Sequence, residues 1–199
     1  MEEEALAPSR ARRLSSSIEA CSLCRFVDKP FVKYEAYLRW LPDEVRVLAV
    51  GESPPPGLKE SSLYNASRFD RFRECMKLIL GLRGELEALQ RLKSSGVFVT
   101  AAVKCRPFSR RDLEAMRRSC LRWLEEELEL LAPRRVVALG RAASASLSEL
   151  LGLRPPRSVV EGGAARAAGL EVFFAPHPNY VLRFRRDLAP TLKGLLLGP

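Results

Sequence analysis

The sequence predicts an α/β protein in which a four-stranded parallel sheet lies between two layers of helices, a three-layer α/β/α sandwich. Four short, nearly continuous apolar runs are typical of strands buried on both faces of such a sheet. They are Val45–Val50, Val97–Val103, Arg135–Leu139 and Leu170–Ala175. Helical segments separate the runs, which favours right-handed crossovers between parallel strands. At 199 residues we expect a single domain, residues 1–199.

The chain before the first strand has a weaker pattern. Residues 1–15 are predicted to be a loose, charged, flexible leader. Ser15–Ser17 can cap a short helix together with Glu19, and this turn leads to Cys21-Ser-Leu-Cys24. Residues 26–42 mix aromatic and basic side chains, and we expect a partly helical arm that lies on the domain.

Helices are expected between and after the strands. The clearest has Phe69, Phe72, Met76 and Leu80 at helical spacing, with arginine and glutamate between them. The predicted helices are Arg68–Leu80, Glu85–Lys93, Ser109–Leu131, Arg141–Leu151 and Tyr180–Leu197. A Gly162-Gly163 turn is expected before the last strand.

The net charge of +9 favours a polyanionic partner, with nucleic acid first. The alternative is the arginine-rich surface of a thermophilic protein, and the scarcity of side-chain amides (Asn65, Gln90 and Asn179) fits that alternative. The sequence contains no apolar run of membrane-spanning length, and residues 1–13 lack the apolar region of a secretory signal. We therefore expect an intracellular, cytoplasmic protein that is nucleoid-associated when bound to DNA.

Five cysteines in an intracellular protein call for an explanation other than disulfides. Cys21 and Cys24 have the spacing that lets two thiolates reach one metal centre. Cys105 follows a strand, and Cys120 lies on a helix that can fold back beside it. Four such thiolates suit one [4Fe–4S] cluster or one Zn²⁺, and the spacing does not separate the two. Cys75 is more simply a core thiol.

Polar residues follow the first strand where open α/β sheets place their ligands. Gly51-Glu52-Ser53 leaves the strand, and Pro54–Pro56 then forbids helix or further strand pairing. The last strand ends in Pro176-His177-Pro178-Asn179. Both segments could equally be ordinary strand exits.

Taken in order, four motifs resemble the uracil-DNA glycosylase superfamily, and most closely its iron–sulfur families 4 and 5. They are the CxxC at Cys21, GES-P-P at Gly51, VTAAVKCRP ending at Pro107, and HPNYVLR beginning at His177. The resemblance covers about residues 21–188. It implies a four-stranded α/β/α domain, a [4Fe–4S] cluster on Cys21, Cys24, Cys105 and Cys120, and hydrolysis of the N-glycosidic bond of a damaged base.

The chain also departs from the family 4 pattern. Ser53 and Pro55 replace small residues of the first motif, and Ala101 stands where family 4 carries the asparagine that reads uracil. An alanine there is found in family 5, whose members accept a wider range of bases. Tyr64 is the nearest match to the aromatic residue that stacks on the flipped base.

The expected chemistry assigns a role to each candidate residue. Glu52 orients water or offsets positive charge on the sugar, and His177, the only histidine, donates to a carbonyl oxygen of the leaving base. Tyr64 stacks on the base. Gly51, Ser53, Asn65 and Asn179 complete the substrate site, although either asparagine could be a turn residue.

Lys104, Arg106, Arg183 and Arg185 are predicted to form a phosphate-binding rim, the alternative being a solvated basic face. We expect a monomeric, monofunctional DNA repair glycosylase that uses water, because no lysine has an obvious pocket position. The alternatives are a catalytically silent nucleic-acid-binding protein of the same fold and a zinc-stapled, heat-adapted protein. A sliding-clamp contact is not disclosed by the sequence.

Overall fold

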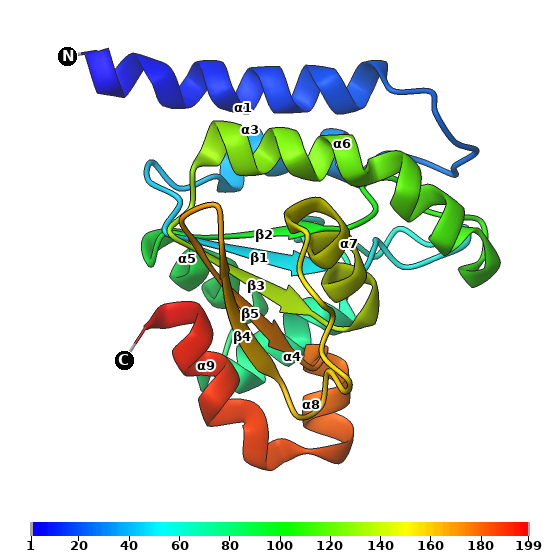
Figure 1. The fold of residues 1–199 in the computed structure, drawn as a ribbon. Coiled ribbons are helices and arrows are strands. Elements are labelled where there is room, and N and C mark those ends of the chain that lie inside the picture. The colour runs from blue at the N-terminus through cyan, green and yellow to red at the C-terminus, as the bar shows by residue number, and fades with distance from the viewer. Residues whose placement is uncertain (1, 199) are drawn as a thin grey trace.

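The computed structural model describes residues 2–198 and contains one five-stranded sheet. The strands are β1 (Val47–Gly51), β2 (Val97–Ala101), β3 (Arg135–Leu139), β4 (Gly163–Ala167) and β5 (Leu170–Ala175), in the order β2-β1-β3-β5-β4. The four predicted strands pair in parallel as expected, and β4 pairs antiparallel with β5 (Figure 1). The α/β class is therefore confirmed, and the strand number was one too low.

Strand β4 escaped prediction because its sequence lacks the usual strand signals. Its five residues are Gly-Ala-Ala-Arg-Ala, without a β-branched or aromatic side chain, and the strand lies at the edge of the sheet. Ala168 and Gly169 both have positive φ, 49° and 79°, which suits the tight turn of a two-residue hairpin. Gly163 thus begins a strand rather than completing the expected turn.

The helices largely follow the predicted segments. They are α1 (Glu2–Ala20), α2 (Pro30–Lys33), α3 (Ala36–Trp40), α4 (Arg71–Leu80), α5 (Glu85–Ser94), α6 (Leu113–Leu131), α7 (Arg141–Leu151), α8 (Pro178–Phe184) and α9 (Ala189–Leu197), with 3-10 turns η1 (Arg110–Asp112) and η2 (Arg186–Leu188). Helix α4 begins later than predicted because Asp70 caps it, its carboxylate accepting from the Arg73 N–H at 2.9 Å.

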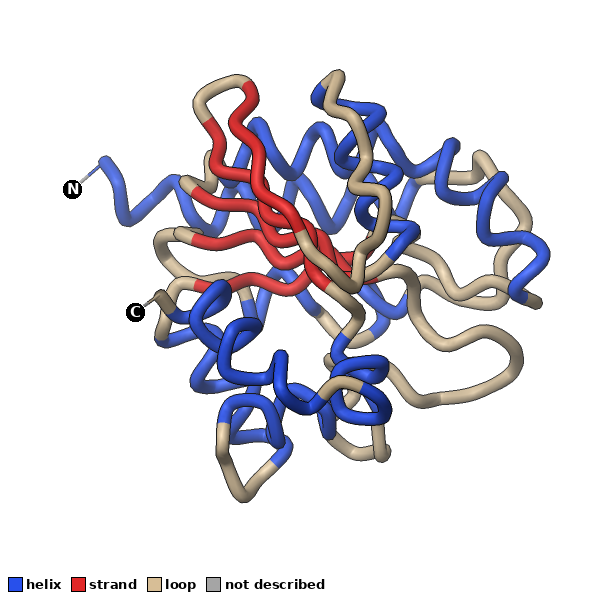
Figure 2. The backbone as a smooth tube through the Cα atoms, turned by 60° about the horizontal axis from the view of Figure 1, so that its bottom comes forward, coloured by secondary structure: helices blue, strands red, loops and turns tan. Residues whose placement is uncertain are grey.

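The sheet separates two apolar layers, with α1, α3, α6 and α7 on one face and α4, α5, α8 and α9 on the other (Figures 1 and 2). Alternate residues of β1 serve the two layers: Leu48 and Val50 face the first, and Val47 and Ala49 face the second. Within residues 2–198, no helix combines the length and the apolar character needed to cross a membrane.

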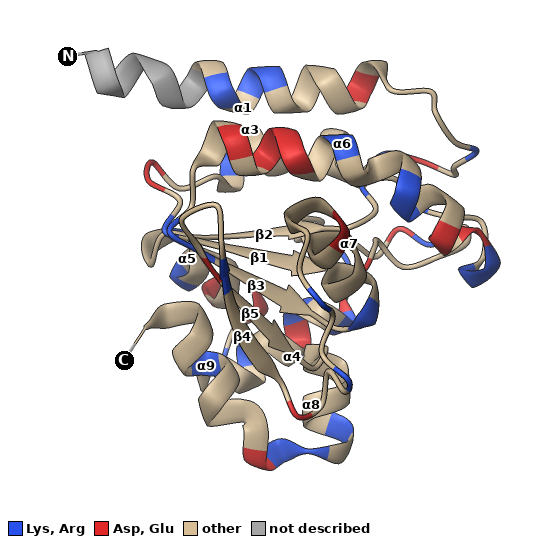
Figure 3. Cartoon of the chain, in the orientation of Figure 1, with Lys and Arg blue, Asp and Glu red and all other residues tan. Residues whose placement is uncertain are grey.

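Residues 1–15 differ from the loose leader that was expected. From residue 2 they belong to α1, which lies along α6 (Figure 1). Ala11, Leu14 and Ile18 recur at helical spacing and are buried, so this helix has an apolar stripe. Figure 3 shows basic residues of α1 above an acidic stretch of α6, and Arg13 pairs with Glu126 at 3.1 Å.

Candidate active site and cysteine centre

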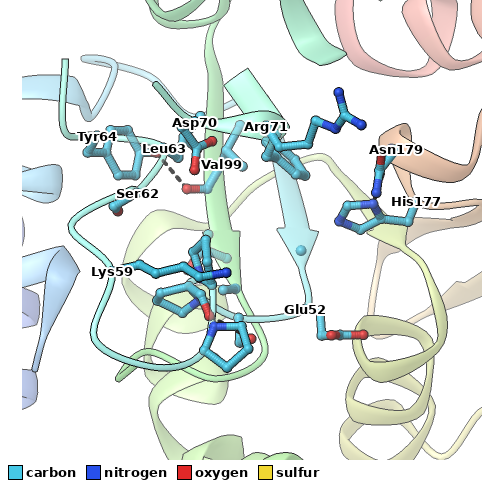
Figure 4. A pocket seen from close by; sticks show the side chains of 18 of the residues that line it. Glu52, Lys59, Ser62, Leu63, Tyr64, Asp70, Arg71, Val99, His177 and Asn179 are labelled. Atoms are coloured by element: carbon cyan, nitrogen blue, oxygen red, sulfur yellow. Dashed lines mark hydrogen bonds between the residues drawn. The ribbon is translucent and has the colours of Figure 1, made fainter. Parts of the chain in front are cut away.

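A cavity of about 330 Å³ opens at the carboxyl ends of β1 and β2, beside the end of β5 (Figure 4). This is the edge at which parallel sheets place their ligands. It is lined by Phe31, Gly51, Glu52, Ser53, Pro54, Pro55, Pro56, Lys59, Ser62, Leu63, Tyr64, Asp70, Arg71, Phe72, Val99, Thr100, Ala101, Arg110, His177 and Asn179. The structure therefore gathers the predicted loops after the first and last strands around one space.

Glu52 reaches the cavity because the pairing of β1 with β2 continues beyond both strands. The Gly51 carbonyl accepts from the Ala102 N–H at 2.9 Å, and the Glu52 carbonyl accepts from the Val103 N–H at 3.0 Å. With its backbone fixed, Glu52 keeps a side chain that is 34% exposed and lines the cavity. A carboxylate so placed can accept a hydrogen bond from water or balance a positive charge.

His177 is held as the N-cap of α8. Its Nδ1 accepts from the Asn179 N–H at 3.2 Å, which leaves Nε2 as the protonated nitrogen of the neutral ring. Burial, followed by the positive charge of Arg110, lowers the pKa of His177 to about 4. At neutral pH the ring is thus an uncharged N–H donor. It also meets the Phe72 ring edge-on, with centroids 5.4 Å apart.

The close approach of the His177 loop to β3 depends on Gly140. This residue has a φ of 94°, and a Cβ on it would lie 3.2 Å from the His177 Cβ. Its N–H donates to the Ala175 carbonyl at 2.8 Å, joining the ends of β3 and β5. A larger residue would strain the backbone and displace the histidine.

Tyr64 lies at the cavity wall, but most of its ring belongs to the core. Its hydroxyl donates to the Val99 carbonyl at 2.6 Å, and its ring stacks on Phe98 with centroids 5.9 Å apart (Figure 4). Trp40 covers it further, at 6.4 Å. The aromatic face predicted for the flipped base is therefore already occupied. Phe72, which also lines the cavity, was not singled out in the sequence.

The two asparagines have different positions. Asn179 lines the cavity, as do Gly51 and Ser53. Asn65 is buried in a turn, where its amide donates to the Glu60 carbonyl at 2.9 Å and its oxygen accepts from the Ser67 hydroxyl at 2.7 Å. The structure does not bring Asn65 to the cavity, because both ends of its amide serve the turn.

Three cations line the cavity that sequence reasoning missed: Lys59, Arg71 and Arg110. Lys59 overturns the expectation that no lysine occupies the pocket. None of the three belongs to a motif singled out in the sequence, so no signal distinguished them before the fold was known.

Lys104 was predicted to bind phosphate, but it is completely buried. Its ammonium pairs with Glu127 of α6 and donates to the Thr100 hydroxyl and the Ala101 carbonyl, each at 2.7 Å. The other Glu127 oxygen accepts from the Tyr37 hydroxyl at 2.6 Å. Lys104 therefore fixes the end of β2 to α6 and cannot contact DNA from this position.

Arg106 is buried as well and also cannot belong to a DNA-binding rim. Its guanidinium donates to the carbonyls of Pro55, at 2.8 Å, and Ser61, at 3.0 Å, and pairs with Asp28 at 2.8 Å. Arg106 thus ties the proline loop of the cavity to the segment that follows Cys24. We regard it as a residue that positions the cavity wall.

Arg183 and Arg185 remain compatible with a rim. Arg183 is exposed and packs over the Phe184 ring at 5.0 Å. Arg185 pairs with Asp187 at 2.8 Å. Both lie at the end of α8, the helix that begins with the His177 loop.

The four predicted ligand cysteines converge from three segments. Burial, followed by the neighbouring Cys120, Cys24 and Cys21, raises the pKa of the Cys105 thiol to about 12. The Trp123 indole N–H donates to the Cys21 sulfur at 3.3 Å. Cys75 lies apart on α4, buried as expected of a core thiol.

Cys105 and Cys120 are buried, and Cys21 and Cys24 are partly buried. Four neighbouring thiols that would repel one another as thiolates fit the donor set of a four-thiolate centre. As the side chains lie, no group of three or more His, Cys, Asp or Glu residues in the described part of the chain could hold a metal ion.

The sequence of this chain is similar to those of known uracil-DNA glycosylases. The family model described as "Uracil DNA glycosylase superfamily" matches residues 38–196. A type-5 uracil-DNA glycosylase of Pyrobaculum aerophilum is 33% identical over 129 residues, which cover 58% of this chain and 56% of that protein. A type-4 enzyme of the same organism is 32% identical over 142 residues, covering 65% and 60%. A type-5 enzyme of Thermus thermophilus is 46% identical over 66 residues, covering 32% and 30%.

Proposed function

Since the chain belongs to the uracil DNA glycosylase superfamily, we propose that it hydrolyses the N-glycosidic bond of uracil or another deaminated base in DNA. The chain spans between about a third and three fifths of the length of these curated relatives. The observation that carries the proposal is the meeting of Glu52 and His177 at one cavity, from loops 125 positions apart in the sequence. DNA containing a damaged base is the partner, and the protein acts as one domain and as a monomer in the cell interior.

Glu52 serves the sugar side of the reaction. As the glycosidic bond breaks, positive charge develops on the sugar, and a carboxylate near it stabilises that charge or orients the attacking water. The fixed Gly51 and Glu52 carbonyls keep this side chain at the cavity while the base is held elsewhere along the wall. Water is the nucleophile.

His177 serves the leaving base. Its Nε2–H can donate to a carbonyl oxygen on which negative charge accumulates, and a neutral ring does so without needing a proton from solvent. Gly51, Ser53 and Asn179 complete the base-binding wall. Ala101 provides no hydrogen-bonding side chain at the cavity floor, which supports tolerance of several deaminated bases.

The same four thiols support a [4Fe–4S] cluster on Cys21, Cys24, Cys105 and Cys120, with Zn²⁺ as the alternative. When bound, such a cluster would be a structural link between the CxxC segment and residues 105–120, in addition to the Arg106–Asp28 ion pair. Measurement of iron, acid-labile sulfide and zinc in the purified protein separates the two metals.

The decisive experiment is base release. Duplex and single-stranded oligonucleotides carrying uracil or hypoxanthine are incubated with the protein and then treated with alkali, which cuts the strand at abasic sites. Cleavage of the uracil strand is expected, whereas intact strands with every lesion would favour the catalytically silent DNA-binding protein.

Lys59 supports a second candidate, a glycosylase that attacks through an amine. Its side chain reaches the cavity (Figure 4), and an amine nucleophile would form a Schiff base with the sugar. Borohydride traps that intermediate as a covalent protein–DNA adduct. We expect no adduct, because Lys59 is exposed to solvent. An adduct that disappears in Lys59→Ala would replace water by Lys59.

A further inference from the structure

Arg110 stands at the cavity between the two proposed active residues. Its Nη1 lies 3.8 Å from the Glu52 Oε1, and its charge acts on His177. The Arg110 side chain is nevertheless 79% exposed. A cation that touches the cavity and still faces solvent is available to a ligand arriving from outside.

The backbone places this cation firmly. Ser109 and Asp112 cap each other around η1: the Ser109 N–H donates to the Asp112 carboxylate at 2.8 Å, and the Arg111 N–H donates to the Ser109 hydroxyl at 3.2 Å. Residues 105–120, which include Arg110, begin and end with cysteines of the four-thiol centre. The backbone position of Arg110 is thus determined by the segments before and after it, whereas its side chain is largely exposed to solvent.

The ion pair with Glu52 is too weak to explain the arginine. Exposed pairs contribute about 0–1 kcal/mol, and this pair is long. A guanidinium binds phosphate through two parallel N–H bonds, which is a better partner than one distant carboxylate oxygen. In the proposed mechanism His177 donates a hydrogen bond to the base. The exposed Arg110 guanidinium therefore remains available for a phosphate of the DNA backbone.

We propose that Arg110 binds a DNA phosphate next to the extruded nucleotide and exchanges its contact with Glu52 for that phosphate. The exchange frees the Glu52 carboxylate at the moment the nucleotide occupies the cavity, so DNA binding and activation of the carboxylate are coupled. This inference rests on the proposed function for its substrate, and its test by DNA binding does not require base release.

The test compares Arg110→Ala with Arg134→Ala. Arg134 is 81% exposed and pairs with Glu44 at 3.3 Å, but it precedes the amino end of β3, away from the cavity. Affinity is measured over a series of salt concentrations for a duplex with a tetrahydrofuran abasic site. We expect Arg110→Ala to bind roughly tenfold more weakly and to lower the slope of log affinity against log salt by about one. Arg134→Ala should match the wild type.

A neutral methylphosphonate at each phosphate flanking the lesion identifies the contact. The wild type should lose affinity at one position, and Arg110→Ala should lose nothing further there. Equal losses in both proteins, or an unchanged salt slope in Arg110→Ala, would overturn the phosphate assignment. Slower base release at unchanged affinity would place Arg110 on the base instead. If the wild type binds normally but releases no base, the proposed function fails while this result stands.

Discussion

Two ion pairs near the end of β2 use similar residues for opposite purposes. Lys104 and Glu127 are completely buried, and the ammonium and both carboxylate oxygens have protein partners. Arg110, which lies on the segment after Lys104, and Glu52, which follows β1, are 79% and 34% exposed and lie 3.8 Å apart. The first pair fixes the fold at the edge of the cavity, and the second stays open to a ligand.

The comparison shows that a basic residue beside a motif cannot be assigned to DNA from charge alone. Lys104 and Arg106 flank Cys105 and were expected to meet phosphate, whereas both hold the cavity wall from inside. Burial, rather than the type of residue, separates the structural cations from the functional ones.

Breaking the buried pair should have the largest effect. Glu127→Ala leaves a buried ammonium and two hydroxyls without their acceptor, and we expect it to lower the free energy of unfolding by about 3–5 kcal/mol. Combining Lys104→Met with Glu127→Gln removes both charges and keeps an acceptor for Tyr37 and Thr100, so this double variant should recover at least half the loss. Urea unfolding measures both. A loss below about 1 kcal/mol in Glu127→Ala would show that the pair is not structural.

The exposed pair should respond in activity and not in stability. In the proposed mechanism Glu52→Gln removes the charge that would face the sugar, and we expect single-turnover base release to slow by roughly a hundredfold. The free energy of unfolding should stay within about 0.5 kcal/mol, because the side chain is a surface group. Glu44→Gln, at the exposed pair with Arg134, is the matched control. Equal rates in the two variants would remove Glu52 from the mechanism.

The strands and helices of the two layers were predicted well because each buries the same face along its whole length. That burial leaves a regular apolar periodicity in the sequence. The four predicted strands and the helix segments between them follow that periodicity. The same signal was present in α1 as Ala11, Leu14 and Ile18, but the surrounding charges concealed it. Strand β4 carries no such signal, because its alanines pack only at an edge.

The site residues that the structure brings together are those that a motif ties to a strand end or to a metal-ligand spacing. Glu52, His177 and Cys105 follow strands, whereas Cys21, Cys24 and Cys120 were singled out by their spacing in the sequence. The sequence does not tell which way successive loop side chains point: Asn65 is buried in a turn, whereas Tyr64 lines the cavity with its hydroxyl on the Val99 carbonyl. Arg110 was missed for the converse reason: it meets Glu52 through the fold of residues 105–120.

His177 differs from both ion pairs, because this partly buried ring has no ionic partner within residues 2–198. Its pKa is lowered to about 4 in the folded protein, whereas in the unfolded chain it lies near the usual 6.5. The unfolded state therefore binds more protons between these values, and stability is complete above pH 6.5 and declines toward pH 4. We expect a loss of about 2–3 kcal/mol over this range.

This histidine is the only one in the chain, so His177→Gln is a clean control. Urea unfolding of both proteins at several pH values between 7 and 4.5 isolates the histidine contribution as the difference between their profiles. Parallel profiles would mean that His177 titrates equally in both states, and the neutral donor proposed for the leaving base would lose its support.

The smallest effects should come from the arginines at the end of α8, which sharpen the contrast between open and paired cations. Arg185 already has a carboxylate partner in Asp187, whereas Arg183 lies over an aromatic ring and keeps its charge for an outside anion. Arg183→Ala should therefore weaken DNA binding a few-fold and reduce its salt dependence, and Arg185→Ala should do so less. Binding measured at two salt concentrations is sufficient.

A larger effect in Arg185→Ala would mean that DNA displaces Asp187, so that an exposed intramolecular ion pair does not prevent its arginine from binding phosphate. That result would be the behaviour proposed for Arg110 and Glu52, observed at a second place on the surface.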